Sequence, residues 1–244
     1  MSYNSFIFNF SSTWVPPFHV CNLDLGLCQL GHPFPAWLEN QKELMYLDIC
    51  NASILGSIPN WFWDLGANLS LFNVPHNQLG GQLPNPLPIA PFADIDFRSN
   101  LFGGGLPLLA VEVKLLDLSN NNFFGPIPQN IGESMPNLIF LSLSDNQLVG
   151  DIPSSIGEML SLQVIDLSGN KLSENIKKFM LNKQELDEHL TKEMVAPTER
   201  QPLRDHVAYQ KWNEKDRSTS YTLLSILQND LIGQFDELPT CKAL

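Results

Sequence analysis

One pattern recurs through most of the first 173 residues and limits the possible fold more than any other feature of the chain. The pattern is LxxLxLxxNxLxGxIP, and its clearest copies read LIFLSLSDNQLVGDIP from Leu138 and VKLLDLSNNNFFGPIP from Val113. The copies follow one another at steps of 21 to 25 residues, beginning at Val20, Leu44, Leu69, Phe92, Val113, Leu138 and Leu162. A period of this length predicts a solenoid of stacked coils rather than a globule around one central core.

Each position of the pattern has a physical role. The apolar first, fourth and sixth positions, such as Leu138, Leu141 and Leu143, predict a short strand with one buried face. Neighbouring copies can bury each other's inward residues, so the strands are expected to form a parallel sheet. The ninth position holds an asparagine whose amide can bond inward-turned backbone groups, at Asn77, Asn100, Asn121, Asn146 and Asn170. Cys28 and Ala52 replace this asparagine in the first two copies, which predicts looser corners there.

These copies resemble leucine-rich repeats. The GxIP extension, the LDLS strands and the phrases IPNWFWDLGANLSLFNV and ESMPNLIFLSLSDNQLVGDIPSSIGEMLSLQVIDLSGNKLS are similar to the ectodomain of plant leucine-rich-repeat receptor-like proteins, over about residues 1–173. The resemblance implies an α/β solenoid with a parallel concave β-sheet that binds a peptide or protein ligand. It also implies a place on the extracellular face of the plasma membrane and a co-receptor kinase as partner in defence or developmental signalling.

The candidate binding surface consists of the solvent-facing positions two, three, five, seven and eight of each strand. Five of the seven side chains at the fifth position are carboxylates, and the seven are Asp24, Asp48, Asn73, Asp96, Asp117, Ser142 and Asp166. These carboxylates favour a basic or donor-rich ligand, or else they only order the strand edge. Tyr46, His76, Arg98 and Phe140 supply side chains that are typical of binding hot spots. The expected ligand-binding residues are Tyr46, Asp48, Asn73, His76, Asp96, Arg98, Asp117 and Phe140.

Other sequence features exclude some function classes. The net charge of −12 argues against nucleic acid as a partner. The sequence has no GxSxG, HExxH, GxxxxGK[ST] or strand-linked GxGxxG motif, so no catalytic residue, metal site or cofactor is expected. The first twenty residues lack the pattern of a signal peptide, and no apolar run reaches bilayer-spanning length.

Three sequons and one cysteine pair add further expectations. Asn9, Asn51 and Asn68 would be glycosylation sites in an exported protein, and Asn51 falls on the candidate binding surface. The repeat register places Cys21 outward and Cys28 inward, so a disulfide between them is not expected.

The composition changes near residue 173. Residues 1–173 carry 4 basic and 14 acidic side chains, whereas residues 174–244 carry 10 basic and 12 acidic ones. We therefore expect a solenoid over 1–173, a helical segment and linker over 174–202, and a third segment over 203–244. Phe179, Leu186, Leu190 and Met194 lie at helical steps in the second segment. The third segment resembles part of the gag polyprotein of plant copia-type retrotransposons, cut short at its end; alternatively, the whole tail is a helical cap over the last repeat.

Three function hypotheses follow from this organisation. The first is a ligand-binding fragment of a plant receptor-like protein without chemistry of its own. The second is a secreted inhibitor of an enzyme, because plant inhibitors of pectin-degrading enzymes have similar GxIP repeats. The third is a non-functional fusion of a receptor with a retroelement.

Overall fold

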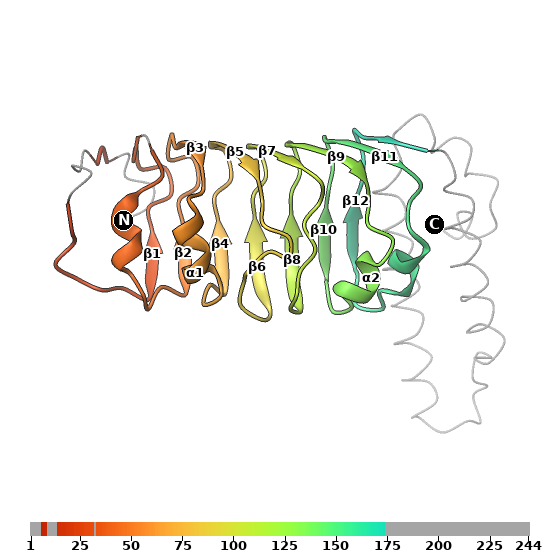
Figure 1. The fold of residues 1–244 in the computed structure, drawn as a ribbon, viewed down its shortest axis with the longest axis horizontal. Coiled ribbons are helices and arrows are strands. Elements are labelled where there is room, and N and C mark those ends of the chain that lie inside the picture. The colour runs from red at the N-terminus through yellow and green to blue at the C-terminus, as the bar shows by residue number, and fades with distance from the viewer. Residues whose placement is uncertain (1–5, 9–13, 32, 174–244) are drawn as a thin grey trace, which may run out of the picture.

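The chain winds into successive coils that stack along one axis (Figure 1). The computed structural model describes residues 6–8, 14–31 and 33–173. Each coil contributes one strand to a seven-stranded parallel sheet, in the order β1-β2-β4-β6-β8-β10-β12. The predicted solenoid and its parallel sheet are confirmed.

The strands of this sheet start at the third residue of each copy of the pattern, except in the fourth and fifth copies, where they start at the second and the first residue. Their bounds are β1 Asn22–Asp24, β2 Tyr46–Asp48, β4 Leu71–Asn73, β6 Ala93–Asp96, β8 Val113–Asp117, β10 Phe140–Ser142 and β12 Val164–Asp166. Short helical segments connect some of the coils on the opposite side. They are α1 Trp63–Gly66, α2 Ile131–Ser134 and the 3₁₀ turns Ala36–Asn40, Asn60–Phe62 and Ser154–Glu158.

The predicted alternation of inward and outward residues holds along these strands. Leu141 on β10 pairs with Leu116 on β8 and Ile165 on β12, and all three side chains are buried. Leu138 and Leu143, the other inward positions of the same copy, are buried as well. Neighbouring coils therefore bury each other's apolar residues, as a stack of repeats requires.

Phe92 departs from the prediction that it faces inward as the first residue of the fourth copy. The pairing of β6 with β8 shifts register between Ala93 and Asp94, so that Ala93 pairs with Val113 and is fully buried. Phe92 is instead 53% exposed, with a backbone φ of +61°. A slip of one residue turns a side chain to the other face of a strand, which explains the correction.

A second parallel sheet, which the sequence did not predict, runs along the coils beside the first. It has six strands: β3 Leu55–Ser57, β5 Gln78–Gln82, β7 Leu101–Gly104, β9 Asn122–Pro126, β11 Gln147–Gly150 and β13 Lys171–Leu172. The glycine of the GxIP extension lies in or at the end of five of these strands with φ between +83° and +94°. This left-handed conformation explains why the pattern needs glycine at that position.

The predicted asparagine ladder forms at the corner that follows each strand of the first sheet. Asn121 accepts a hydrogen bond from the Phe102 N–H at 3.0 Å and donates to the carbonyl oxygens of Phe97, Leu118 and Ser119 at 2.9, 3.2 and 3.0 Å. The other four ladder asparagines bond the backbone of two coils in the same way. Cys28 and Ala52 are fully buried at the two corners without asparagine, and the looseness expected there remains a prediction.

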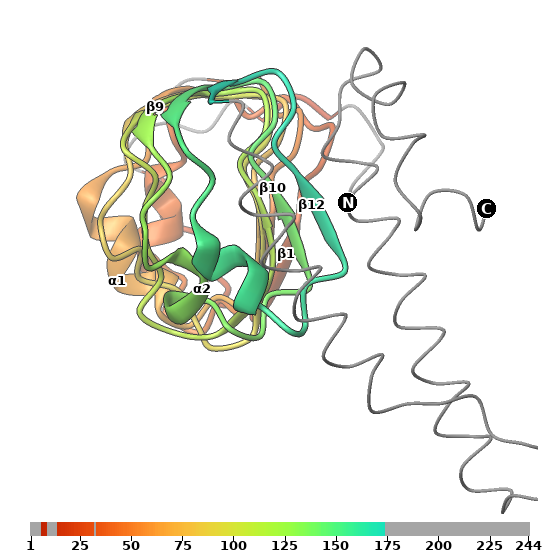
Figure 2. The same ribbon diagram turned by 90° about the vertical axis from the view of Figure 1, so that its right-hand side faces the viewer.

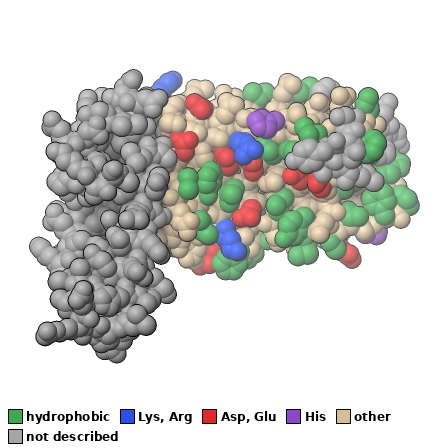
Figure 3. Space-filling view, turned by 180° about the vertical axis from the view of Figure 1, so that it is seen from behind, with side chains coloured by type: hydrophobic (Ala, Val, Ile, Leu, Met, Phe, Trp, Pro, Cys, Tyr) green, Lys and Arg blue, Asp and Glu red, His purple; other side chains and the backbone are tan. Residues whose placement is uncertain are grey.

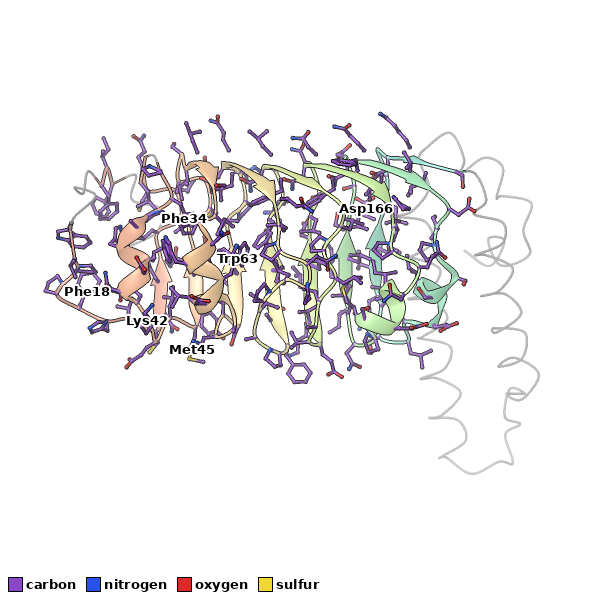
Figure 4. The ribbon with its side chains drawn as sticks, in the orientation of Figure 1. Phe18, Phe34, Lys42, Met45, Trp63 and Asp166 are labelled. Carbon is purple, nitrogen blue, oxygen red and sulfur yellow. The ribbon has the colours of Figure 1, made fainter. Side chains whose placement is uncertain are left out.

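The core lies between the two sheets and the helical side of the coils. Figure 2 shows β1, β10 and β12 on one side of the coil and α1 and α2 on the other. Aromatic rings line the core of the middle coils, with ring centroids 5.0 Å apart for Phe62 and Phe72, 4.9 Å for Phe72 and Phe97, and 5.5 Å for Phe97 and Phe102. Figure 4 shows the side chains that fill the coils, with Phe34 and Trp63 on the helical side.

The N-terminal residues pair with the first coil. Ile7 forms an isolated parallel bridge with Gln29, and the Phe8 N–H donates to the Gln29 carbonyl at 2.9 Å. Buried Gln41 ties residues 18–20 to the same coil, because it accepts from the Val20 N–H and donates to the Phe18 carbonyl.

Several predictions fall outside the described residues. They are the sequon at Asn9, the helix over 174–202 and the gag-like segment over 203–244. Within the described part of the chain, no helix has the length and apolarity that crossing a membrane requires.

Candidate ligand-binding face

The outward side of β1, β2, β4, β6, β8, β10 and β12, with the turns that follow these strands, is the surface predicted to bind a ligand. We call it the seven-stranded face. Its residues at equal repeat positions are paired through the sheet register, so each position forms a continuous row. Figure 3 shows this face from outside, with charged and histidine side chains near its centre and hydrophobic side chains beside them.

All eight predicted binding residues lie on this face. Asp48, Asn73, Asp96 and Asp117 are direct neighbours in the fifth-position row. Tyr46 on β2 is 45% exposed and Phe140 on β10 is half-buried, four strands apart in the sheet. His76 and Arg98 occupy adjacent turns, where the His76 N–H donates to the Arg98 carbonyl at 3.1 Å.

The aspartates of the fifth-position row organise the turns that follow their strands. In each of the five, Oδ1 accepts a hydrogen bond from the backbone N–H two residues later, at 3.0 to 3.1 Å. Asp117 and Asp166 also accept from the hydroxyls of Ser119 and Ser168. One oxygen of each aspartate therefore serves its own turn, as one of the two sequence interpretations expected. The second oxygen of Asp48 accepts from the Asn73 amide at 3.4 Å, and those of Asp96 and Asp117 lie near Arg98.

Arg98 is engaged within the face. Its Nη1 lies 3.0 Å from Asp96 Oδ2 and 3.8 Å from Asp117 Oδ2, so one guanidinium serves two carboxylates. Burial raises the pKa of Asp96 to about 6, against which the Arg98 backbone and guanidinium act. The Arg98 guanidinium therefore partly neutralises the two carboxylates of its own face. This pairing was not predicted from the sequence.

The expectation that every residue between the inward positions faces solvent is wrong for Ser142. It points outward between Asp117 and Asp166 in the row, yet it is only 4% exposed, and its hydroxyl lies 3.3 Å from that of Ser144. Asp117 is similarly buried, at 7%. Longer neighbours on adjacent strands cover short side chains in a sheet, which alternation within one strand cannot reveal.

The third-position row is largely apolar, which the sequence reasoning recognised only at Tyr46 and Phe140. Leu71, Leu115 and Val164 are its apolar members on β4, β8 and β12. Its polar members are Asn22 on β1 and Asp94 on β6. The sequence contains the signal for this row, because the third residue of each copy can be read from the repeat pattern.

At one edge of the face, the Lys114 Nζ lies 6.0 Å from the centroid of the Phe92 ring.

Cysteines and sequons fall mostly as the register predicts. Cys21 is exposed and Cys28 is buried, so they lie on different sides of the coil. The pKa of the Cys50 thiol is raised to about 11, mainly by burial and to a smaller extent by the hydrogen bond of the thiol to Asp48, so the thiol stays protonated. Asn51, in the turn after β2, and Asn68, after α1, are both exposed.

Comparisons with known proteins agree with this geometry. The leucine-rich repeat family models match residues 43–65 and 112–172. Receptor-like protein EIX2 of Solanum lycopersicum is 34% identical over 128 residues, which cover 52% of this chain and 12% of that protein. The chain therefore spans only a small part of the length of such curated relatives.

Two solved structures share the fold. The ectodomain of the Arabidopsis thaliana receptor kinase GASSHO1/SCHENGEN3, solved in complex with CASPARIAN STRIP INTEGRITY FACTOR 2, is 30% identical with a TM-score of 0.54, covering 62% of this chain and 18% of that one. The plant peptide hormone receptor RGFR1, in complex with RGF2, is 26% identical with a TM-score of 0.50, covering 67% and 30%. The described chain is a leucine-rich-repeat solenoid whose repeats are similar to those of plant receptor-like proteins.

Proposed function

We propose that this chain binds a peptide or protein ligand on the seven-stranded face, as a segment of a plant receptor-like protein in defence or developmental signalling. The observation that carries the proposal is the face itself: exposed aromatic, aliphatic and charged side chains are aligned in rows across seven strands. Solenoids present such extended surfaces to their partners, and aromatic residues and arginine are enriched at binding hot spots.

The two similar solved structures support this proposal, because one is in complex with CASPARIAN STRIP INTEGRITY FACTOR 2 and the other with RGF2. By the similarity of the repeats to those of receptor-like proteins, we propose a co-receptor kinase as partner and the extracellular face of the plasma membrane as location. The proposal assigns no catalysis to the chain, and it includes glycosylation at the exposed Asn51 and Asn68 in an exported protein.

The test uses peptides selected from a random display library on the full 244-residue chain. Tyr46→Ala and Phe140→Ala should each weaken the selected peptides by about 1 to 2 kcal/mol, because both remove ring surface from the face. Phe124→Ala is the matched control, since Phe124 is 57% exposed on β9 of the six-stranded sheet.

Affinities measured by titration calorimetry decide the outcome. Peptides that lose affinity with Phe124→Ala and keep it with the two substitutions on the seven-stranded face would place binding elsewhere. Arg98→Ala is a less clean test, because Arg98 also pairs with Asp96 and Asp117.

A further inference from the structure

We propose that the ligand of the seven-stranded face is an extended peptide segment in which apolar and basic side chains alternate. This inference rests on the proposed function and adds the chemical class of the ligand. It follows from two rows of different chemistry that run side by side along the sheet.

The first row is the apolar third-position row. Its large apolar side chains are Tyr46, Leu71, Leu115, Phe140 and Val164, and the sheet register places them in line across the strands. Tyr46 is 45% and Val164 38% exposed, and the other three are half-buried. Asp94 on β6 interrupts the row between Leu71 and Leu115, so the apolar side chains form two runs, one on β2 and β4 and one on β8, β10 and β12. Exposed apolar surface that spans adjacent strands is typical of a binding site.

The second row, at the fifth position, is acidic. Within the residues that the structure describes, both ion pairs of side chains belong to Arg98, which serves Asp96 and Asp117. Asp24, Asp48 and Asp166 on β1, β2 and β12 form no ion pair there, and Figure 4 labels Asp166, the last residue of β12. Asn73 on β4 and Ser142 on β10 are the neutral members of this row. A ligand that docks beside the row therefore meets carboxylates outside ion pairs near both ends of the sheet, on β1, β2 and β12, and cationic side chains complement them.

The spacing of the rows favours an extended ligand. Residues at the third and fifth positions lie on the same face of one strand, about 7 Å apart, and adjacent strands lie about 4.8 Å apart. An extended peptide laid along the rows points successive side chains to opposite sides. Every second side chain can then contact the apolar row, while those between them reach the carboxylates. A helix, with a period of 3.6 residues, would offer one stripe instead of two.

The negative charge of the fifth-position row disfavours a ligand in which apolar and acidic residues alternate. A segment that alternates apolar and acidic residues would place its carboxylates against Asp24, Asp48 and Asp166, and the like charges would repel each other. A peptide with the same residues in two blocks would match each row over only half of its length. The order of residues, and not only their composition, should therefore set the affinity.

The experiment reads the sequences selected from the random peptide library on the full chain. We expect apolar and Arg or Lys residues to alternate over at least about six positions, the length needed to reach across several strands. A synthetic peptide with the consensus sequence, monomeric in solution, should bind at least about tenfold more tightly than its block-permuted counterpart. Phe140→Ala should weaken the consensus peptide about 5- to 30-fold.

Matched variants separate the two rows. Asp166→Asn should weaken the consensus peptide several-fold and reduce the dependence of its affinity on salt, because one carboxylate contact is lost. Asp64→Asn on α1 and Phe124→Ala on β9 should leave the affinity within about twofold of that of the unaltered chain. A melting curve of each variant checks that the fold is intact.

The outcomes distinguish the inference from the proposed function. Selected peptides that depend on Tyr46 and Phe140 but lack alternation, or carry acidic residues, overturn the inference and leave the proposed function standing. Peptides that bind independently of Tyr46 and Phe140, or the absence of any face-dependent peptide, overturn both. Alternating basic and apolar peptides that depend on Phe140 and Asp166 support both.

Discussion

Asn121 illustrates how a single side chain holds two coils together. Its amide accepts one backbone hydrogen bond and donates three, with partners in its own coil and in the preceding one. Only 7% of Asn121 is exposed, so water does not readily replace these bonds. The ladder thus satisfies backbone groups that turn inward at each corner, which would otherwise remain unpaired.

Asn121→Ala should lower the free energy of unfolding by about 2 to 4 kcal/mol, because the Phe102 N–H and the Phe97 carbonyl lose their side-chain partner inside the protein. Asn122→Ala, at the exposed next residue, is the control and should change it by less than about 0.5 kcal/mol. A urea titration measures both. Equal losses would mean that the ladder adds nothing beyond ordinary surface contacts.

Asp96 should make stability depend on pH. Its pKa is raised from about 3.8 to about 6, so its stabilising contribution is complete below about pH 4 and is lost as the pH rises through 6. Asp96→Asn removes this loss and should be more stable than the unaltered chain at pH 7, by on the order of 1 kcal/mol after allowance for solvent screening. The difference should vanish below about pH 4.

Thermal melts between pH 4 and 8 test this expectation. Arg98→Ala is the companion variant: because Arg98 lowers the pKa of Asp96, its removal should move the pH-dependent window upward. At each pH, the stability of Asp96→Asn is compared with that of the unaltered chain. If the variant lost relative stability between pH 4 and pH 7, the ion pair with Arg98 would outweigh the cost of burying the carboxylate.

Between elements, the helical side of the coils depends on close backbone approach. Gly132 in α2 is buried against the 3₁₀ turn Ser154–Glu158 of the next coil, and its N–H donates to the Ser155 hydroxyl at 3.2 Å. A Cβ atom on Gly132 would lie 1.9 Å from the Ser155 carbonyl oxygen. Gly66 in α1 stands in the same relation to the Pro88 carbonyl oxygen, at 2.5 Å. Glycine thus sets the distance between coils at two places.

Gly132→Ala should therefore destabilise the fold by about 3 kcal/mol or more, since backbone of two packed coils would have to move apart. Gly105→Ala is the control, because a Cβ there meets nothing within 4 Å, and it should change the stability by less than about 1 kcal/mol. Circular dichroism during denaturant titration gives both values. If Gly132→Ala left the free energy of unfolding unchanged, the two coils could separate enough to accommodate the Cβ atom at little energetic cost.

Across the whole molecule, the solenoid is a stack in which each coil contacts only its neighbours. Within the described chain, β1 and β12 are the outer strands of the seven-stranded sheet. Outer strands leave backbone groups open to other chains, and the stability of a stack is a sum over neighbouring coils. The sequence adds a change of composition near residue 173, where the density of charged residues rises.

We expect limited proteolysis to cut near residue 174 before any site within the third to sixth repeats, because those repeats bury their backbone in two sheets. Mass spectrometry of the first fragments locates the cut. Size-exclusion chromatography of the chain made alone should show dimers or aggregates. A monodisperse monomer that is cut first inside the repeats would make the tail an integral cap of the solenoid.

The repeat pattern was sufficient to predict the strands, the inward residues such as Leu141 and Leu143, the asparagine ladder and the rows of the seven-stranded face. These features depend on local alternation and on the period of the copies, which a single chain carries in its order of residues.

Other features depend on which residues meet when the coils stack. The outward turn of Phe92, the burial of Ser142, the sharing of Arg98 between two carboxylates and the second sheet all arise from contacts between coils. Periodicity states on which side of a strand a residue lies, but not the register of the neighbouring strand or the length of the side chains beside it. Register and neighbours set burial and charge pairing, so these properties of the face emerged only from the packed structure.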